Sequence, residues 1–372
     1  MLCPVRVQRA GLVGRRQLTS GAIKVQARSI GFDLCGIAPA VPFPELQRLR
    51  SWIGRGYAGT MAYLDRTADR RMDPQLVLPG ARSIVVTGTV YDVGRPGSTQ
   101  AADPGRALIS RYAWGDDYHD TLRARLDALL AWMRDESGTP FDARAYVDTG
   151  PVQEKVLAHY AGIGWLGKNA CVINPDLGSW IFLSVVLTSL PLEPDAPAFD
   201  QCGACSLCLE ACPTGALVEP RELDATRCLS YLTIELKGAI PVGLRPALGA
   251  HIFGCDICQE VCPWNSLAAR TAAREWQPRE GLDRPRLADL WRQSDGQLEA
   301  LARGTPLTRP KLAGLRRNMA VAIGNCRDPV AHASLRDPGT TGAPDRSPSR
   351  DDPVVREHIA WAEERLRTRG RV

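Results

Sequence analysis

The chain has 372 residues, more than a single hydrophobic core usually holds, so its length predicts two or three domains. Hydrophobic residues make up 44% and charged residues 23% of the chain, which excludes bulk disorder and a fibrous repeat. The formal net charge of +5 is too small by itself to indicate a nucleic-acid partner.

The chain contains twelve cysteines, and eight of them lie between Cys202 and Cys262. This clustering is too tight for a disulfide network spread through a large secreted enzyme, so it indicates metal binding in a reducing compartment. No stretch is long and apolar enough to span a bilayer, because the best candidate, residues 180–192, is short and carries Ser and Thr. We therefore expect a cytoplasmic protein with no membrane partner.

The first part of the chain begins with a predicted extension and then alternates between helix and strand. Residues 1–20 are rich in Arg and contain no acid, and we interpret them as a poorly ordered extension. The pattern predicts a helix at residues 23–30 and a short strand at 33–37, and the β-branched run at 83–90 predicts a buried strand. Residues 119–136 predict an amphipathic helix, whose apolar face holds Leu122, Leu126, Leu129, Leu130 and Met133.

The alternation continues up to about residue 195. We predict a strand at residues 143–147, a helix at 152–160 with Pro151 at its start, and a long buried strand at 179–190. Such an order indicates an α/β or α+β layer and excludes a helix bundle.

The composition changes twice in the second part of the chain. Residues 191–197, rich in Pro and acid, predict a domain boundary before the cysteine block. After Trp276 the pattern becomes helical, with an apolar-faced helix at 311–324 and a last helix at 354–367. The intervening residues 337–353 are rich in Pro, Gly, Ser and Asp and predict a loop. We therefore expect domains at residues 21–195, 196–272 and 273–372, the last being all-α.

The cysteine block contains the spacing of a bacterial ferredoxin twice. Cys202-x2-Cys205-x2-Cys208-x3-Cys212-Pro213 matches the motif of a [4Fe–4S] cluster. The second copy has its first cysteine moved upstream by an insertion, and it consists of Cys228 followed by Cys255-x2-Cys258-x3-Cys262-Pro263. The spacing is highly specific, because three thiolates in a tight loop bind three irons while the fourth points toward a second cluster.

The ferredoxin rule assigns the last cysteine of each motif to the other cluster. One predicted cluster is therefore held by Cys202, Cys205, Cys208 and Cys262, and the other by Cys212, Cys228, Cys255 and Cys258. The alternative is zinc held by four thiolates, but zinc sites seldom repeat this spacing before Pro. The remaining cysteines have no metal spacing, and we interpret Cys3, Cys35, Cys171 and Cys326 as small buried hydrophobic residues.

One further motif is misleading. Gly162-x-Gly164-x-x-Gly167 matches a dinucleotide fingerprint, but the true motif follows a strand and opens a helix. Here a predicted helix comes first, so we do not expect a nicotinamide cofactor.

Taken in order, the motifs resemble the epoxyqueuosine reductases, cobalamin-dependent iron–sulfur enzymes that complete queuosine synthesis on tRNA. The resemblance covers roughly residues 21–330 and includes both cysteine motifs. It also includes Gly-Phe-Asp at 31–33 leading to Ala-Pro at 38–39, Arg-Met-Asp-Pro at 71–74, Leu-Pro-Gly-Ala-Arg-Ser at 78–83, Ser-Arg-Tyr-Ala-Trp-Gly at 110–115, Asp-Tyr-His at 117–119, Val-Asp-Thr-Gly at 147–150, Ala-Gly-Ile-Gly-Trp-Leu-Gly-Lys-Asn at 161–169 and Gly-Ser-Trp at 178–180.

The resemblance implies an α+β fold with three parts. Residues 21–195 would form a nitroreductase-like domain that binds cobalamin, and residues 196–272 a ferredoxin-like domain with two [4Fe–4S] clusters. The C-terminal region would be helical and HEAT-like. Residues 352–361 are similar to the second half of a HEAT-like unit, whereas residues 337–350 depart from such a repeat.

The resemblance also nominates site residues. It implies that Asp148 is the proton donor, although spacing alone would make this residue a turn or a cap. The positions that would lie at or near cobalamin are Arg71, Ala113, Asp148, Val172, Gly178, Ser179, Leu183, Ser230 and Glu235. From pattern alone, Val172 and Leu183 would be core residues, and both interpretations are compatible because a corrin needs an apolar wall.

The implied reaction reduces the epoxide of epoxyqueuosine to an alkene with loss of water. The clusters would pass electrons one at a time to cobalamin, and a carboxylic acid with a raised pKa would protonate the substrate oxygen. The implied partners are tRNA and an unidentified electron donor, and we expect a monomer.

The tRNA contacts are predicted from charge and from the resemblance. Residues 300–327 carry six cations and no acid, among them Arg316 and Arg317, which we predict to bind phosphate. The resemblance adds Lys237, which lies in the insertion between Cys228 and Cys255. The alternative is a solvated helix face.

Two other functions are compatible with part of the pattern. A reductive dehalogenase also couples two clusters to cobalamin, but such enzymes usually carry an export signal and a Tyr acid. A simple electron-transfer module would use residues 21–195 only as a scaffold.

Overall fold

The computed structural model describes residues 18–98, 103–266, 268–336 and 348–369. Of the predicted N-terminal extension, residues 1–17 lie outside the described part of the chain. The prediction that the extension reaches residue 20 is wrong, because Leu18 is buried and helix α1 begins at Ser20. Thr19 caps this helix by accepting a hydrogen bond from the backbone N–H of Ala22 at 3.2 Å.

The first part of the chain is built on a four-stranded antiparallel sheet. Its strand order is β1 (Leu34–Pro39), β2 (Ser83–Val90), β7 (Ile181–Thr188) and β4 (Ala143–Tyr146). In the central pair, Ser83 lies opposite Thr188 and Val90 opposite Ile181. Every residue of β2 is buried, as expected for a β-branched run covered on both faces.

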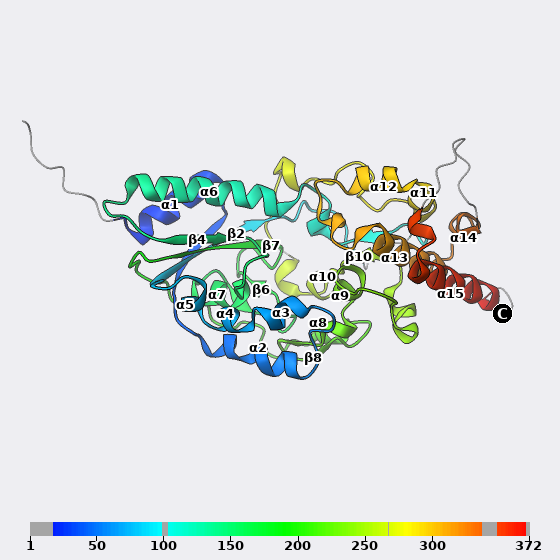
Figure 1. Ribbon diagram of the computed structural model, residues 1–372, viewed down its shortest axis with the longest axis horizontal. Helices are drawn as coiled ribbons and strands as arrows, with labels where there is room; N and C mark the ends of the chain where they lie inside the picture. Colours follow the sequence, from blue (N-terminus) through cyan, green and yellow to red (C-terminus); the bar gives the residue numbers. More distant parts are fainter. Residues whose placement is uncertain (1–17, 99–102, 267, 337–347, 370–372) are drawn as a thin grey trace, which may run out of the picture.

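Helices cover both faces of this sheet (Figure 1). One face is covered by α1 (Ser20–Ile30) and by α6 (Tyr118–Glu136), whose buried side chains are the five that its periodicity predicts. The other face is covered by α7 (Glu154–Tyr160), α2 (Pro44–Gly54) and α5 (Pro74–Val77). The short helices α3 (Ala62–Arg66) and α4 (Ala68–Met72) lie between α2 and α5 in the chain.

The cysteine region lies between this layer and the C-terminal helices (Figure 1). Its elements are α8 (Leu207–Glu210), the hairpin β8 (Leu217–Glu219) and β9 (Glu222–Leu223), α9 (Leu229–Ile234), β10 (His251–Phe253) and α10 (Ile257–Glu260). β10 pairs in parallel with β3 (Leu108–Ile109) of the first part. This pairing joins the two regions through backbone hydrogen bonds.

The C-terminal region is all-α, as predicted. Its helices are α11 (Leu287–Arg292), α12 (Asp295–Ala302), α13 (Lys311–Asn325), α14 (Pro329–Arg336) and α15 (Pro353–Arg369). Gly324 allows α15 to approach α13, because a Cβ atom there would lie 2.8 Å from that of Ala362. Residues 337–347 of the predicted loop lie outside the described part. Its remainder holds a 3₁₀ turn at Pro348–Arg350, and α15 begins at Pro353, one residue before the predicted start at 354.

The prediction that Arg316 and Arg317 bind phosphate is wrong. Both side chains are buried, with exposed fractions of 0% and 2%. Arg316 donates to the backbone carbonyl of Trp291 at 2.6 Å and pairs with Asp295 at 3.2 Å. Arg317 donates to the carbonyls of Leu232, Leu236 and Gly238 at 2.6 to 2.8 Å. Burial lowers the pKa of both guanidinium groups to about 10.

The glycines of the apparent dinucleotide motif have a packing role. The segment passes through β5 (Trp165–Leu166), which pairs with β6 (Val172–Ile173). A Cβ atom at Gly164 would lie 2.3 Å from the carbonyl oxygen of Ile173. A Cβ atom at Gly167 would lie 2.5 Å from the side chain of Ile173. The glycines therefore allow two backbones to approach.

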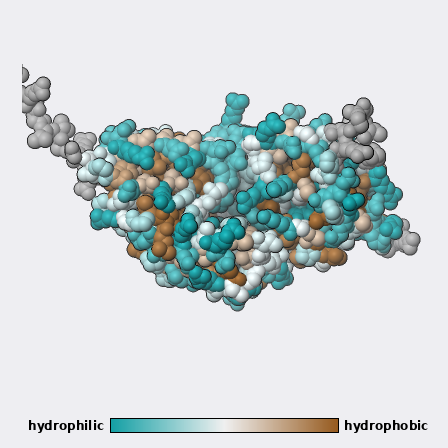
Figure 2. Space-filling model, in the orientation of Figure 1, coloured by the Kyte–Doolittle hydropathy of each residue, from teal (hydrophilic) through white to brown (hydrophobic). Residues whose placement is uncertain are grey.

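The surface of the molecule is mostly polar on the face shown in Figure 2, where hydrophobic residues form separate patches. Among the helices of the described residues, none is both long enough and apolar enough to cross a membrane.

Candidate functional site

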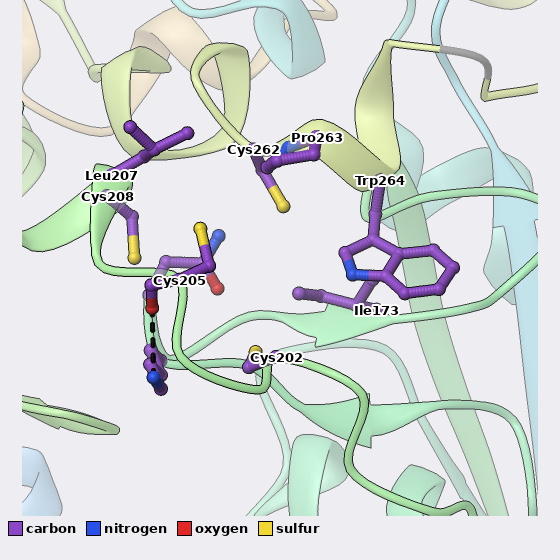
Figure 3. Close-up of a pocket in the computed structure, with 10 residues that line it drawn as sticks. Ile173, Cys202, Cys205, Leu207, Cys208, Cys262, Pro263 and Trp264 are labelled. Atoms are coloured by element: carbon purple, nitrogen blue, oxygen red, sulfur yellow. Dashed lines mark hydrogen bonds between the residues drawn. The ribbon is translucent and has the colours of Figure 1, made fainter.

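The first predicted cysteine set surrounds a small cavity. Cys202, Cys205, Cys208 and Cys262 line it together with Ile173, Leu207 and Trp264 (Figure 3). The loop that carries Cys202, Cys205 and Cys208 is held by Lys168, whose ammonium group donates to the carbonyls of Gly203 and Cys205 at 2.6 and 2.9 Å. The indole N–H of Trp165 lies 3.4 Å from the Cys202 sulfur, a distance suited to donation to a thiolate.

The second set is brought together by the insertion. Cys228 precedes α9, and Cys258 lies in α10. The charges of Cys212 and Cys228 both act on the Cys255 thiol, and the charges of Cys255 and Cys228 act on Cys258. Cys262, by contrast, is influenced by Cys202, Cys205 and Cys208. Cys258 also has Cys171 as a neighbour, so the grouping of Cys212, Cys228, Cys255 and Cys258 stays a prediction from the ferredoxin spacing.

The donor sets fit clusters better than single ions. The described residues contain no group of three or more His, Cys, Asp or Glu side chains arranged around one metal ion. Separated thiols around a cavity are what a cluster needs, because each thiolate binds a different iron.

The other cysteines differ from one another. Cys35 and Cys326 are buried, in keeping with the hydrophobic role predicted for them. Cys171 is only half-buried, and its thiol is hydrogen-bonded to that of Cys258, a neighbour that spacing could not reveal. Cys3 lies outside the described residues.

Asp148 occupies a tight turn directly after strand β4. Its φ is +56°, a region that residues other than Gly rarely adopt, and the N–H of Thr149 bonds across it to the carbonyl of Val147. This three-residue closure is a classic γ-turn, which is rare and strained. The Asp148 side chain does not cap α7. It accepts a hydrogen bond from the Tyr118 hydroxyl at 2.9 Å.

A histidine links Asp148 to a second carboxylate. The Nε2 atom of His119 lies 3.5 Å from Oδ2 of Asp148, and its Nδ1 atom lies 2.7 Å from Oδ1 of Asp117. Asp117 also caps α6 through the backbone N–H of His119, so the first turn of α6 positions the whole group. A proton can therefore be shared along a line of three side chains.

The Asp148 side chain is exposed, with 64% of its surface accessible to water, although desolvation is the largest single influence on its pKa. We call the surroundings of this carboxylate the recess. The charge of Asp148 also acts on Tyr63, Tyr112 and Arg309, which lie around the same recess.

The expected raised pKa of Asp148 is not found. Desolvation pushes this pKa upward, but hydrogen bonds from His119 and Tyr118 outweigh it, and the pKa lies below its ordinary value. Burial lowers the pKa of His119, but its hydrogen bonds to Asp117 and Asp148 raise it to about 9. At neutral pH the proton therefore resides on His119, one hydrogen bond away from the predicted donor.

A half-buried acid lies on the other side of Asp148. The carboxylate of Glu154, at the start of α7, accepts a hydrogen bond from the backbone N–H of Asp148 at 2.8 Å. Burial and the charge of Asp148 raise the pKa of Glu154 to about 8.

Several residues predicted near cobalamin surround the recess. Arg71 is half-buried in α4, and the charges of Asp148 and Glu154 act on it. Ala113 is fully buried in the turn before Trp114. Glu235, at the end of α9, acts on the pKa of Tyr63 and Tyr112 together with Asp148. The recess is thus bordered by both the sheet region and the cysteine region.

The remaining predicted positions have other immediate neighbours. Val172 is buried in β6, Leu183 is half-buried in β7, and Ser230 is half-buried in α9. Gly178 and Ser179 lie against the cysteine region, where Ser179 accepts from Asn265 at 2.8 Å and from Gln259 at 3.0 Å. A Cβ atom at Gly178 would lie 2.3 Å from the Asn265 side chain, so this contact requires glycine.

A cleft of about 540 Å³ lies between α3, the end of α9 and the start of α13. It is lined by Lys237, Arg66, Lys311, Arg309 and Tyr63, among others, and the first three of these are exposed. Arg309 lies 6.0 Å from the centre of the Tyr63 ring and pairs with Glu235 at 3.0 Å. The cleft therefore presents cations and an aromatic ring beside the recess of Asp148.

Comparison with known proteins places these features in context. The family model described as epoxyqueuosine reductase QueG matches residues 71–149, and a 4Fe-4S double cluster binding domain matches residues 201–265. The epoxyqueuosine reductase of Pseudomonas aeruginosa is 42% identical, covering 92% of each chain. That of Xanthomonas campestris pv. campestris is 38% identical, covering 95% of this chain and 98% of the relative.

Two solved structures are similar over most of the chain. An epoxyqueuosine reductase with an epoxyqueuosine-modified tRNA-Tyr stem loop has a TM-score of 0.81 at 32% identity, covering 93% of this chain and 89% of the other. The Bacillus subtilis epoxyqueuosine reductase has a TM-score of 0.79 at 31% identity, covering 93% and 90%. The latter was captured with its catalytic aspartate loop swung out of the active site.

Three residues of the site are not predicted from the sequence. Tyr118 and His119 belong to the motif at 117–119 but carry no predicted role, and Glu154 lies in the helix predicted at 152–160 with no role of its own. The signal available for the first two was their position at the start of α6, directly after an N-cap acid. Nothing in the pattern near Glu154 indicates that its carboxylate turns back to Asp148.

Proposed function

The chain belongs to the epoxyqueuosine reductase family, and we propose that it forms queuosine on tRNA with Asp148 as the acid that protonates the substrate oxygen. It is an oxidoreductase that uses two [4Fe–4S] clusters and cobalamin. We assign cobalamin to residues 18–195, the clusters to 196–272, and a supporting helical role to 273–372. Family membership disfavours the reductive dehalogenase and the electron-transfer module.

The observation that carries the role of Asp148 is its position in the recess with protonated His119 as its neighbour. In the reaction both C–O bonds of the epoxide break, two electrons and two protons are taken up, and the oxygen leaves as water. The bound clusters and cobalamin supply the electrons. Asp148 receives a proton from His119 and gives it to the oxygen, while Asp117 stabilises the His119 cation.

We assign the residues near the cofactor by the same reasoning. Arg71 and Glu235 border the recess from opposite regions, and Ala113, Val172 and Leu183 contribute apolar wall. Gly178, Ser179 and Ser230 lie on the segments that join this wall to the cysteine region. We also place Asp148 among the residues that line the cofactor site.

The cleft beside the recess is the tRNA contact that we propose. Arg317 and Glu235 also line it, but the phosphate-binding cations that we propose in place of Arg316 and Arg317 are its exposed ones. Lys237, Arg66 and Lys311 are exposed there, and Tyr63 offers a ring on which a base can stack. Because the cleft adjoins the recess, phosphate bound at the cleft would hold the wobble nucleotide close to Asp148.

Electrons enter, in our proposal, at the cluster held by Cys202, Cys205, Cys208 and Cys262. Phe199, which precedes this loop, is exposed by 86%, and Leu207, which lies within it, by 46%. A small one-electron carrier protein can dock on such apolar side chains. The Phe199→Asp variant should be reduced more slowly by a carrier protein and at an unchanged rate by dithionite; wild-type rates with both reductants would contradict this docking surface.

One chain supplies all eight cluster cysteines and the Asp148 group, so we propose that the monomer is the active form. Light scattering of the holoenzyme during chromatography tests this point. Because the substrate is tRNA and the cluster thiols are free, we expect it to act in the cytoplasm.

The function is tested by mass spectrometry of tRNA nucleosides from cells that lack the protein. Epoxyqueuosine should accumulate, and the wild-type chain should restore queuosine. The Asp148→Asn variant should keep the cluster and cobalamin spectra without restoring queuosine, whereas Asp135→Asn, an exposed aspartate of α6, should restore it. Queuosine formation by Asp148→Asn would remove Asp148 from the mechanism, and absence of epoxyqueuosine in the deletion strain would refute the function.

A further inference from the structure

The turn that carries Asp148 is held at both ends. On the upstream side, β4 ends at Tyr146, which pairs with Val185 of the sheet. On the downstream side, Arg71 donates to the carbonyl of Val152 at 2.9 Å, and Gln153 donates to the carbonyls of Leu46 and Arg71 at 3.0 Å. These contacts fix where the turn begins and ends, but they do not determine the backbone conformation at its tip.

The tip is strained and needs a partner of its own. A non-Gly residue at φ +56° in a γ-turn costs free energy that the surrounding structure must offset. The Bacillus subtilis epoxyqueuosine reductase was seen with its own catalytic aspartate loop swung out of the active site. The inward arrangement is therefore one of two that such a loop can adopt, and a contact made at the tip favours it over the other.

Glu154 makes that contact. Its carboxylate accepts the Asp148 backbone N–H at 2.8 Å, and it extends from the first turn of α7, an element packed on the sheet. The side chain is half-buried, and Asp148, Arg71 and His119 all act on its charge. A helix-borne carboxylate of this kind is a rigid support, while the acid that it supports sits on a loop.

We propose that Glu154 is a positioning residue that holds the Asp148 turn in its inward conformation, so that the acid remains within reach of the substrate oxygen. This inference rests on the proposed role of Asp148. The bond is made to the backbone N–H, so it leaves the Asp148 carboxylate available to Tyr118 and His119.

Three variants separate position from charge. Glu154→Gln keeps the length and the accepting oxygen and removes the group that can ionise or give up a proton. Glu154→Asp keeps the charge and shortens the side chain by one methylene, which takes the carboxylate out of reach of the N–H. Glu154→Ala removes both. Glu299→Ala, an exposed glutamate of α12, is the matched control.

The measurements are hydrogen exchange of residues 147–150 in the holoenzyme, and kcat and KM on epoxyqueuosine-modified tRNA. We expect Glu154→Asp and Glu154→Ala to exchange about tenfold faster in this segment. Their kcat should fall roughly 10- to 100-fold with little change in KM, because the acid is misplaced and tRNA binding is not affected. Glu154→Gln should be close to wild type in both measurements.

Two results would overturn the proposal. One is wild-type exchange and kcat in both Glu154→Asp and Glu154→Ala, which would show that the contact is dispensable. The other is a Glu154→Gln variant with a protected turn and a kcat as low as that of Glu154→Ala, which would make Glu154 a proton donor. If the wild type itself does not reduce epoxyqueuosine, the proposed function fails, while the exchange data still decide whether Glu154 holds the turn.

Discussion

At the scale of single residues, the acid proposed to protonate the substrate, Asp148, is a different group from the one that holds the proton at neutral pH, His119. Asp148 has a lowered pKa and faces the recess, whereas His119 has a raised pKa and lies behind it. A carboxylate that is ionised at rest receives its proton only when one is needed. This arrangement differs from the neutral carboxylic acid that a mechanism drawn from sequence suggests, and it makes His119 the group that controls the pH dependence.

The first prediction concerns pH. Because its pKa of about 9 lies above the ordinary value, His119 remains protonated through neutral pH and loses its proton as pH rises through 9. The kcat of the wild type should therefore be constant near neutrality and fall above about pH 9. His119→Gln should have a lower kcat and lack this fall. An unchanged alkaline fall in that variant would assign it to a different group, and His332→Gln, on α14, is the control.

At the scale of elements, hydrophobic periodicity predicted the helices and strands that bury one face or both faces against the core. The apolar stripe of α6 and the β-branched run of β2 were correct, because burial requires these patterns directly. The helix predicted from residue 152 begins at Glu154; the carbonyl of Val152 accepts from Arg71, and the side chain of Gln153 donates to the carbonyl of Arg71. Local signals do not encode such long-range partners.

The same limit explains the error at α13. An acid-free run of cations suggests a phosphate-binding face, because the sequence does not show backbone carbonyls as acceptors. In the structure the carbonyls at the end of α9 and after it accept from Arg317. Cys202, Cys205, Cys208 and Cys262, which line one cavity, were grouped from the sequence because their spacing follows from cluster chemistry. Glu154 was missed because its partner is a backbone N–H.

The second prediction follows from this burial. Arg317→Ala should lower the free energy of unfolding by about 3 kcal/mol, because three buried carbonyls lose their donor. Chemical denaturation of the holoenzyme measures this loss. The tRNA affinity of the remaining folded protein should keep its dependence on salt. If Arg317→Ala had wild-type stability and its tRNA affinity depended less on salt, Arg317 would be a phosphate-binding residue after all.

At the scale of the whole molecule, the two cysteine motifs interlock. Cys262 belongs to the second motif but lies with Cys202, Cys205 and Cys208 of the first. The third prediction is that Cys262→Ser removes the first cluster and spares the second, so iron falls from about eight to about four atoms per chain. Iron analysis with electron paramagnetic resonance of the reduced protein distinguishes the two. Loss of the signal of the second cluster alone would reverse the assignment.

The molecule as a whole must also place a large RNA so that one nucleotide enters the recess. The cleft at Lys237 and Lys311 adjoins the side chains that surround Asp148, and Arg309 belongs to both groups. Cations at this position would act by releasing counterions from phosphate, an effect that is measured by the salt dependence of affinity.

The fourth prediction tests that cleft. Lys237→Ala/Lys311→Ala should reduce the slope of log affinity against log salt by about 1.4 to 1.8, since each phosphate contact contributes about 0.7 to 0.9. Both side chains are exposed, so the free energy of unfolding should hardly change. The exposed pair Arg48 and Arg70 is the control, because it removes two cations from outside the lining of the cleft. An equal reduction of the slope in the control variant would mean that net charge, rather than this cleft, attracts the tRNA.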